Sequence, residues 1–254
     1  SVKQKGKSDN ESANSSMSVR TGRECFRALS MPEAVTLASG VYRVRASVPS
    51  GSKATADMVQ TDEAFWTIFS FHFLSGAAFT KADCDAGLTR AVLDATTARK
   101  LFGTTDAVGR TVQLDYVDYT VAGVVADVSM LATAAYAQIW VPYTAAGADA
   151  MSWRDDTMGP MHAIILARSS ADFDAIREET ELLRKKYNDG LQDVEVFYRG
   201  QPDTQLAYLY RRWYAEPDVP GVMLRYAIVV IILLLVPAVN LSGMTLSRMR
   251  RRMA

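Results

Sequence analysis

Residues 226–247 read YAIVVIILLLVPAVNLSGMTLS and carry no charged side chain. At about 1.5 Å per residue, a helix of this length is roughly 33 Å long, and the hydrocarbon core of a bilayer is about 30 Å thick. A helix or strand buried in a protein core is the alternative, but a helix that is apolar on every side is unusual in a domain of this size. The stretch therefore predicts a transmembrane helix.

The charges on either side of this stretch predict its orientation. Arg225 precedes it, and four arginines follow it: Arg248, Arg250, Arg251 and Arg252. Because Lys and Arg concentrate on the cytoplasmic side of membrane helices, residues 1–225 are expected outside the cytoplasm and residues 248–254 inside it, as at a bacterial inner membrane. Residues 1–224 hold 23 Lys and Arg against 28 Asp and Glu, an acidic balance that argues against nucleic acid as a partner.

The second half of the apolar stretch contains residues that a lone anchor does not need. Pro237 removes a backbone hydrogen bond, Asn240 requires a polar partner in lipid, and Gly243 lets another backbone approach. These three residues predict packing against other transmembrane helices.

The segment before the helix, residues 206–225, is rich in aromatic side chains. Tyr208, Tyr210, Trp213 and Tyr214 lie within seven positions. Rings with polar tips suit the headgroup zone of a membrane, so the segment is interpreted as an interfacial anchor. An aromatic stripe that packs on the outer domain explains the same pattern equally well.

Residues 1–205 show an α+β pattern. Residues 1–16 are polar and are expected to form a disordered arm. Thr21-Gly-Arg-Glu24 fits a capping box that begins a helix, and a strand is expected near residues 34–38. Pro49-Ser-Gly51 predicts the turn of a hairpin between strands at 42–48 and 54–60.

Short strands are expected to dominate residues 41–160, with further strands at 91–93, 111–114, 119–125 and 138–141 and a helix at 95–101 that ends at Gly103. Gly123, inside a strand, marks a bulge or a close approach of another backbone.

After residue 160 the pattern changes to strand, helix, strand. Residues 161–168 and 193–198 are expected to be strands, and Ser170 is expected to cap a helix over 172–188. We therefore predict an α/β subdomain made of two halves, 17–40 and 161–205, with a β-rich subdomain, 41–160, inserted between them and one transmembrane helix behind.

No catalytic, cofactor-binding or metal-binding residues are predicted. The chain has no GxGxxG, GxxxxGK[ST] or GxSxG pattern. Asp83-Cys-Asp85 begins like a calcium loop, but Gly87 and Leu88 stand where a ligand and a glycine are needed. Cys25 and Cys84 are either buried thiols or, outside the cytoplasm, a disulfide.

Two stretches resemble a known family. The first comprises Phe65-Trp-Thr-Ile-Phe69, Phe73-Leu-Ser-Gly76, Ala98-Arg-Lys-Leu-Phe-Gly103, Asp106-Ala-Val-Gly-Arg110 and Tyr119-Thr-Val-Ala-Gly-Val-Val125, and the second comprises Pro237-Ala-Val-Asn-Leu-Ser-Gly243 and Ser247-Arg-Met-Arg-Arg-Arg252. The first resembles the periplasmic core domain of MacB/FtsX-type ABC transporter permeases. The second resembles that family's second transmembrane helix and the basic segment after it.

The resemblance implies a permease subunit without catalytic activity of its own. Such a subunit couples ATP hydrolysis by a separate or fused ABC ATPase to movement outside the membrane, in efflux, export or lipoprotein release. It implies a homodimer or a paired permease and leaves room for a periplasmic partner protein. Residues 248–254 would then begin the segment that contacts the ATPase, although their arginines equally explain topology alone. The family's other transmembrane helices are absent from residues 1–254, so this sequence is expected to be part of a longer protein.

Two other functions remain as alternatives. A single-pass receptor or sensor would bind a ligand with its outer domain, and would require a signalling domain after Ala254. An anchored extracytoplasmic enzyme is the third, and it lacks any motif in the sequence.

Overall fold

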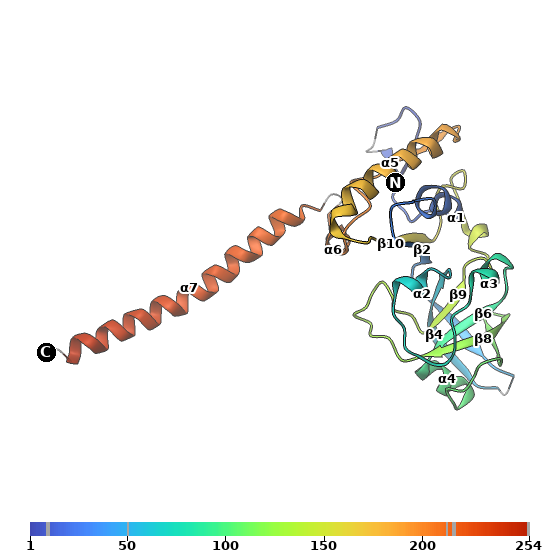
Figure 1. The fold of residues 1–254 in the computed structure, drawn as a ribbon, viewed down its shortest axis with the longest axis horizontal. Coiled ribbons are helices and arrows are strands. Elements are labelled where there is room, and N and C mark those ends of the chain that lie inside the picture. Colours follow the sequence, from blue (N-terminus) through green and yellow to red (C-terminus); the bar gives the residue numbers. More distant parts are fainter. Residues whose placement is uncertain (9–10, 50, 212, 215–216, 253–254) are drawn as a thin grey trace. The chain divides into compact units, whose positions relative to one another are not determined.

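The computed structural model describes residues 1–8, 11–49, 51–211, 213–214 and 217–252, without the side chains of residues 149, 238 and 240–252. It divides the chain into two units, Ser1–Phe197 and Tyr198–Ala254. Figure 1 shows the mixed helices and strands of the first unit and the long helix of the second.

Seven strands of the first unit form one sheet. They are β3 (Tyr42–Ser47), β4 (Lys53–Thr61), β5 (Phe73–Gly76), β6 (Arg90–Asp94), β7 (Thr111–Leu114), β8 (Val117–Val125) and β9 (Ile139–Pro142). Their order is β5-β8-β6-β9-β4-β3-β7, and β7 pairs with β8 as well. That extra pairing closes six strands into a barrel and leaves β5 on its outside. The β-rich pattern predicted for this region, including the β3–β4 hairpin, is therefore present.

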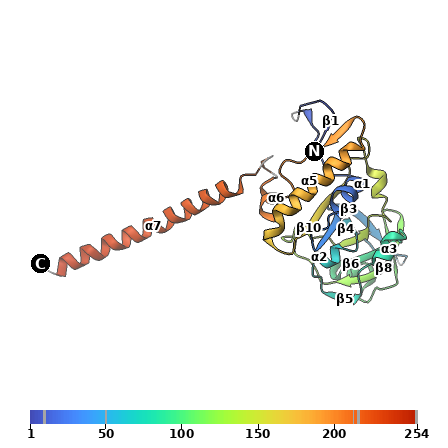
Figure 2. The same ribbon diagram turned by 45° about the horizontal axis from the view of Figure 1, so that its top comes forward.

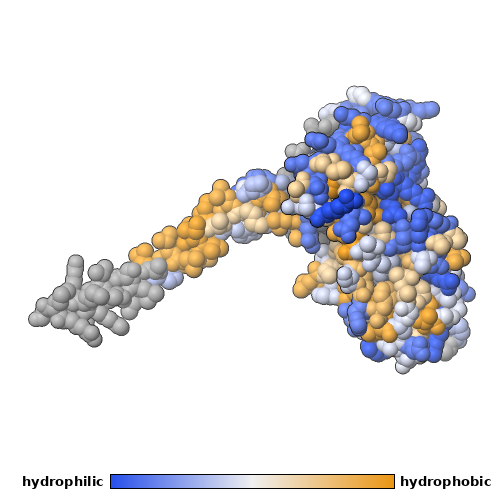
Figure 3. Space-filling model, in the orientation of Figure 1, coloured by the Kyte–Doolittle hydropathy of each residue, from blue (hydrophilic) through white to orange (hydrophobic). Residues whose placement is uncertain are grey.

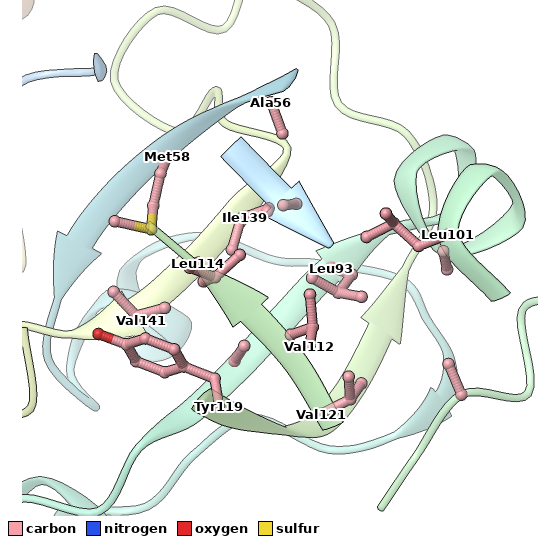
Figure 4. Packing of buried hydrophobic residues seen from close by; sticks show 14 of the residues in the cluster. Ala56, Met58, Leu93, Leu101, Val112, Leu114, Tyr119, Val121, Ile139 and Val141 are labelled. Carbon is pink, nitrogen blue, oxygen red and sulfur yellow. The ribbon is translucent and has the colours of Figure 1, made fainter. Parts of the chain in front are cut away.

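Alternate residues of these strands fill the barrel. Leu93, Val112, Val121 and Ile139 point toward one another in Figure 4, and all four are at most 1% exposed. Helix α4 (Ala95–Phe102) adds Leu101 to the same core. It ends at Gly103 in the left-handed conformation (φ 74°), as the sequence predicts.

The two ends of the outer region meet in a second group of elements. Strand β2 (Ala34–Ser39) pairs antiparallel with β10 (Met161–Leu166), from Ala34 opposite Leu166 to Ser39 opposite Met161. Around them lie α1 (Val19–Gly22), the π-helix η2 (Arg23–Arg27) and α5 (Phe173–Asp189). The predicted assembly of an α/β part from segments more than 100 residues apart is confirmed by this pairing.

The helix starts differ from the sequence prediction. Helix α1 is capped by Ser18, which accepts a hydrogen bond from the Thr21 amide, so the predicted capping box of Thr21 and Glu24 is wrong. Thr21 is buried instead, and its hydroxyl contacts the Tyr187 hydroxyl at 2.9 Å. Before α5, the capping box is formed by Ser169 and Asp172, one residue earlier than expected. It begins the short helix η4 (Ser170–Asp172).

The N-terminal arm is ordered where disorder was expected. Strand β1 (Val2–Gln4) pairs antiparallel with β11 (Val194–Val196), as Figure 2 shows beside the N-terminus. Val2 is 3% exposed, and Lys3 forms an ion pair with Glu195 at 3.1 Å. Polar composition predicted disorder because it could not reveal a partner strand about 190 residues away.

The remaining elements are short, except for the last. They are α2 (Phe65–Ile68), α3 (Lys81–Asp85), η3 (Ala148–Met151), α6 (Gln205–Arg211) and α7 (Val219–Arg252). By length and composition, α7 is the one helix among the described residues that could cross a membrane. The part of α7 that is apolar enough is Val219–Pro237, and this apolar window begins seven residues before the predicted stretch.

Candidate functional site: a polar seam between β2 and β4

The candidate site is a row of buried polar residues where the α/β part meets the barrel. Strand β2 belongs to the α/β part and β4 to the barrel. After β2 the chain enters the barrel through Gly40 and β3, which precedes β4. We call this row the polar seam, and it consists of Thr36, Ser39, Gln60, Thr61 and Asp62, all at most 8% exposed. Because buried polar groups cost free energy unless they are hydrogen-bonded, each seam residue needs a partner.

Asp62, directly after β4, is the centre of the seam. Its carboxylate accepts hydrogen bonds from the Thr36 hydroxyl (2.6 Å), the Leu37 amide (3.0 Å) and the Ala64 amide (3.1 Å). The first two donors lie on β2 and the third opens α2. One side chain thus fixes β2, the end of β4 and the start of α2 to one another.

Arg27 brings the end of η2 to the same place. Its Nε lies 3.8 Å from Asp62, and its Nη2 donates to Glu63 at 2.7 Å. Its Nη1 donates to the Val35 carbonyl on β2. Burial works against the charge of Arg27, but Asp62 and Glu63 outweigh this effect and raise the pKa of its guanidinium.

The rest of the seam follows β2 toward Gly40. The Thr61 hydroxyl donates to the Leu37 carbonyl at 3.0 Å and lies 3.2 Å from the Thr36 hydroxyl. The Gln60 amide donates to Ser39 at 2.9 Å, and the Gln60 side chain donates to the Tyr42 hydroxyl at 2.6 Å. Side-chain bonds thus replace a regular strand ladder between β2 and β4.

Burial makes the Asp62 carboxyl group a weaker acid than an ordinary aspartate. It raises the pKa of Asp62 above the ordinary range of an aspartate, against the opposing effects of the Thr36 hydrogen bond and the Arg27 charge. A proton therefore binds Asp62 more readily here than in an unfolded chain.

An aromatic cluster lies behind the seam. Its members are Phe65, Trp66, Phe69, Phe71, Phe73, Phe79 and Trp140. The rings of Phe65 and Phe69 lie 4.8 Å apart, and those of Phe71 and Trp140 lie 5.3 Å apart. Since α2 carries Phe65 and begins at the residues that Asp62 holds, the seam continues directly into this aromatic cluster.

The seam has the chemistry of a structural joint. Among the described residues, no group of three or more His, Cys, Asp and Glu side chains could hold a metal ion. Asp83 closes a capping box with Thr80 at the start of α3 and pairs with Arg90, so the calcium-like spacing serves a helix start. Cys25 and Cys84 are described as buried thiols rather than a disulfide, and burial raises the pKa of Cys84 to about 12.

The residues singled out in the sequence lie elsewhere, all on α7. Pro237 is inside this helix. The backbones of Asn240 and Gly243 and of Arg248, Arg250, Arg251 and Arg252 continue the helix, but their side chains lie outside the described residues. Their predicted roles in helix packing, topology and ATPase coupling therefore remain predictions.

Sequence reasoning missed Asp62, Arg27 and Thr36. The one local signal was a carboxylate placed directly after a strand and before an aromatic run, at Asp62. Its partners Thr36 and Arg27 lie 26 and 35 residues away in the sequence, and no local pattern connects them to Asp62.

The comparisons with known proteins agree with this architecture. Residues 2–183 match the family model described as the MacB-like periplasmic core domain. The chain therefore belongs to the family of MacB-like periplasmic core domains, as the resemblance in the sequence predicted. A comparison with curated proteins found no match.

Solved structures share the fold at low sequence identity. The extracellular domain of the noncanonical ABC-type transporter YknZ from Gram-positive bacteria is 18% identical, with a TM-score of 0.53, over 75% of this chain and 95% of that one. The periplasmic region of MacB from Actinobacillus actinomycetemcomitans is 17% identical, with a TM-score of 0.54, over 76% and 85%. A domain of a putative permease from Porphyromonas gingivalis is 17% identical, with a TM-score of 0.54, over 82% and 94%.

Proposed function

We propose that this chain is the extracytoplasmic part of an ABC transporter permease subunit, and that it couples ATP hydrolysis in the cytoplasm to movement outside the membrane. The observation that carries the proposal is one chain that joins a MacB-like periplasmic core domain to an exposed apolar helix. Efflux, export and lipoprotein release are the processes that such coupling serves. The chain itself performs no catalysis in this proposal.

The exposure of α7 supports its membrane role. Leu233, Leu234, Leu235 and Val236 are consecutive and are 66, 68, 53 and 57% exposed. Four consecutive residues point around most of a helix, at 3.6 residues per turn. Figure 3 shows the described part of the helix as mostly hydrophobic. A helix that exposes apolar side chains on every side requires lipid or other apolar helices around it.

The proposed arrangement follows from the charges. Residues 1–225 lie outside the cytoplasmic membrane, and the arginines at 248–252 lie in the cytoplasm, where they meet an ABC ATPase. The permease works as a homodimer or with a second permease, and Pro237, Asn240 and Gly243 pack against the other membrane helices. A periplasmic partner protein completes the machinery outside.

The test is a co-purification. The gene product that contains this chain is expressed with the ABC ATPase encoded nearest to it and reconstituted in lipid nanodiscs. We expect a stable complex that hydrolyses ATP. The triple variant Arg250→Glu, Arg251→Glu, Arg252→Glu should weaken it, while the matched Lys variant, which keeps the topological charge, should not.

A cysteine label placed after Ala254 reports which side of the membrane the C-terminus occupies in each variant. This control separates loss of coupling from inversion of the helix. If the protein forms no complex with any ABC ATPase and its outer unit binds a small ligand, the proposal is wrong and a single-pass receptor replaces it.

A further inference from the structure

The aromatic segment before α7 begins with helix α6 (Gln205–Arg211), which carries the ion-paired Arg211. Thr204 accepts a hydrogen bond from the Ala207 amide at 3.2 Å and so caps α6. After α6 ends, the amides of Trp213 and Tyr214 still donate to the Tyr210 carbonyl, at 2.9 and 3.1 Å. These two hydrogen bonds hold Trp213 and Tyr214 close to the end of α6.

The charge of Arg211 is neutralised within the same segment. Its guanidinium donates to both carboxylate oxygens of Asp203, with Nη2 at 2.8 Å from Oδ1, and also to the Arg199 carbonyl at 2.8 Å. The Arg211 and Asp203 side chains are only 18% and 9% exposed. The charged groups of Arg211 and Asp203 thus face each other rather than solvent.

The large apolar side chains of the segment are exposed instead. Tyr208 is 57% exposed, Leu209 is 51%, Trp213 is 77% and Tyr214 is 56%. Burying such side chains is favourable in proportion to the apolar area removed from water, so a cluster of four within seven residues calls for a partner surface. Three of the four carry a polar tip on an apolar ring, the combination that suits the boundary between lipid and water.

The connection to α7 identifies the partner. Helix α6 lies against α7, and Tyr226, in the second turn of α7, is close to the Tyr210 hydroxyl. Asp218 caps α7 through the Gly221 amide at 3.0 Å, so the apolar window begins at Val219, eight residues after α6 ends. Helix α6 therefore lies beside the first turns of the candidate membrane span.

We propose that α6, with Trp213 and Tyr214, is an interfacial helix that binds the headgroup region of the membrane and holds the end of α7 at a fixed depth. This inference rests on the membrane role of α7 in the proposed function. Because Arg211 is paired with Asp203, this arginine contributes little to the attraction of anionic lipid, and the aromatic side chains supply the apolar contact. The interface would give the permease a fixed point against which α7 works.

Tryptophan quenching tests the depth directly. The chain is reconstituted in phosphatidylcholine vesicles brominated either near the headgroups or near the chain ends. Its tryptophans are Trp66, Trp140, Trp153 and Trp213. We expect shallow bromines to quench Trp213 more than deep ones, and the conservative variant Trp213→Phe to lose at least half of the shallow quenching. The matched variant Trp153→Phe, in the first unit, should keep it.

A second reporter separates this inference from the proposed function. In the Trp213→Phe background, Leu233→Trp places a tryptophan inside the unbroken apolar run Ala227–Val236, where deep bromines should quench it. If deep quenching of that residue is present but Trp213 is insensitive to shallow bromines, the interfacial helix is wrong while the membrane span stands, and the aromatic cluster binds protein. If neither tryptophan is quenched, the membrane role of α7 fails as well.

Discussion

Asp62 is a buried carboxylate whose partners come from η2, β2 and α2. Its pKa is raised, so the folded chain binds a proton at Asp62 more readily than the unfolded chain does. Stability from this group is therefore greatest at low pH and is lost as the pH rises from the ordinary aspartate range through the raised pKa.

We predict that acid stabilises the natural protein relative to Asp62→Asn. The free energy of unfolding of both proteins is measured by urea titration in detergent micelles between pH 7 and pH 4.5. The free energy of unfolding of the variant is subtracted from that of the natural protein, so that titrations common to both cancel. This difference should increase as the pH falls. Asp174→Asn serves as the control for removing a carboxylate from the surface, since the Asp174 side chain is 91% exposed. A shift in the opposite direction would show that the charge of Arg27 outweighs burial.

At this scale the sequence revealed local chemistry and missed distant chemistry. Gly103 was predicted as a helix end because a left-handed residue after an amphipathic helix is a local pattern. The start of the first helix was predicted at Thr21, but Thr21 is buried against Tyr187 and Ser18 caps the helix instead. The sequence around Asp62 has no pattern that identifies its role, because that role depends on contacts with Arg27 and Thr36.

Strands β5 and β8 show how an element is shaped by one residue. The pairing of β6 with β8 shifts register beside Gly123, so the predicted bulge is present. A Cβ atom at Gly123 would lie 2.6 Å from the Ala77 carbonyl oxygen and 2.9 Å from the Phe73 ring. The predicted close approach is therefore also present, and it lies between β8 and the end of β5.

We predict that Gly123→Ala destabilises the barrel by about 1–3 kcal/mol, because the clash is with backbone that must move. The matched variant is Gly40→Ala, where an added Cβ meets nothing within 4 Å. This change should be neutral or should stabilise the protein by about 0.4–1 kcal/mol, because alanine lowers the conformational entropy of the unfolded chain. Urea unfolding followed by circular dichroism measures both. Equal effects from the two variants would refute the role of the close approach.

Element pairing across the chain was the least accessible to sequence analysis. The hairpin β3–β4 was predicted from Pro49 and Gly51 because its strands are neighbours. The pairing of β1 with β11 spans almost the whole first unit, and short polar strands have no pattern that distinguishes them from disorder. Residues 17–40 and 161–205 were predicted to form one α/β subdomain, and the pairing of β2 with β10, which was not itself predicted, joins these two segments.

At the scale of the molecule, the polar seam decides whether the α/β part and the barrel move as one. Every seam residue is buried and makes at least one hydrogen bond, although the Gln60 Oε1 has no partner among the described residues, and Asp62 alone joins three elements. Such a network opens only at the cost of unpaired buried groups. The structure also treats Ser1–Phe197 as one unit. A permease that uses this unit should therefore move it as a rigid body.

A disulfide across the seam tests the rigid body. The hydroxyls of Thr36 and Thr61 are 3.2 Å apart, so the double variant Thr36→Cys, Thr61→Cys can form a disulfide after small side-chain rotations. Closing this loop should stabilise the unit by roughly 3 kcal/mol relative to the reduced form. In complex with its ABC ATPase, the oxidised variant should hydrolyse ATP at the rate of the same protein after reduction. The single cysteine variants control for the lost hydroxyls. If oxidation abolishes ATP hydrolysis and reduction restores it, the seam opens during the cycle, and the working movement lies between the two parts of the outer unit.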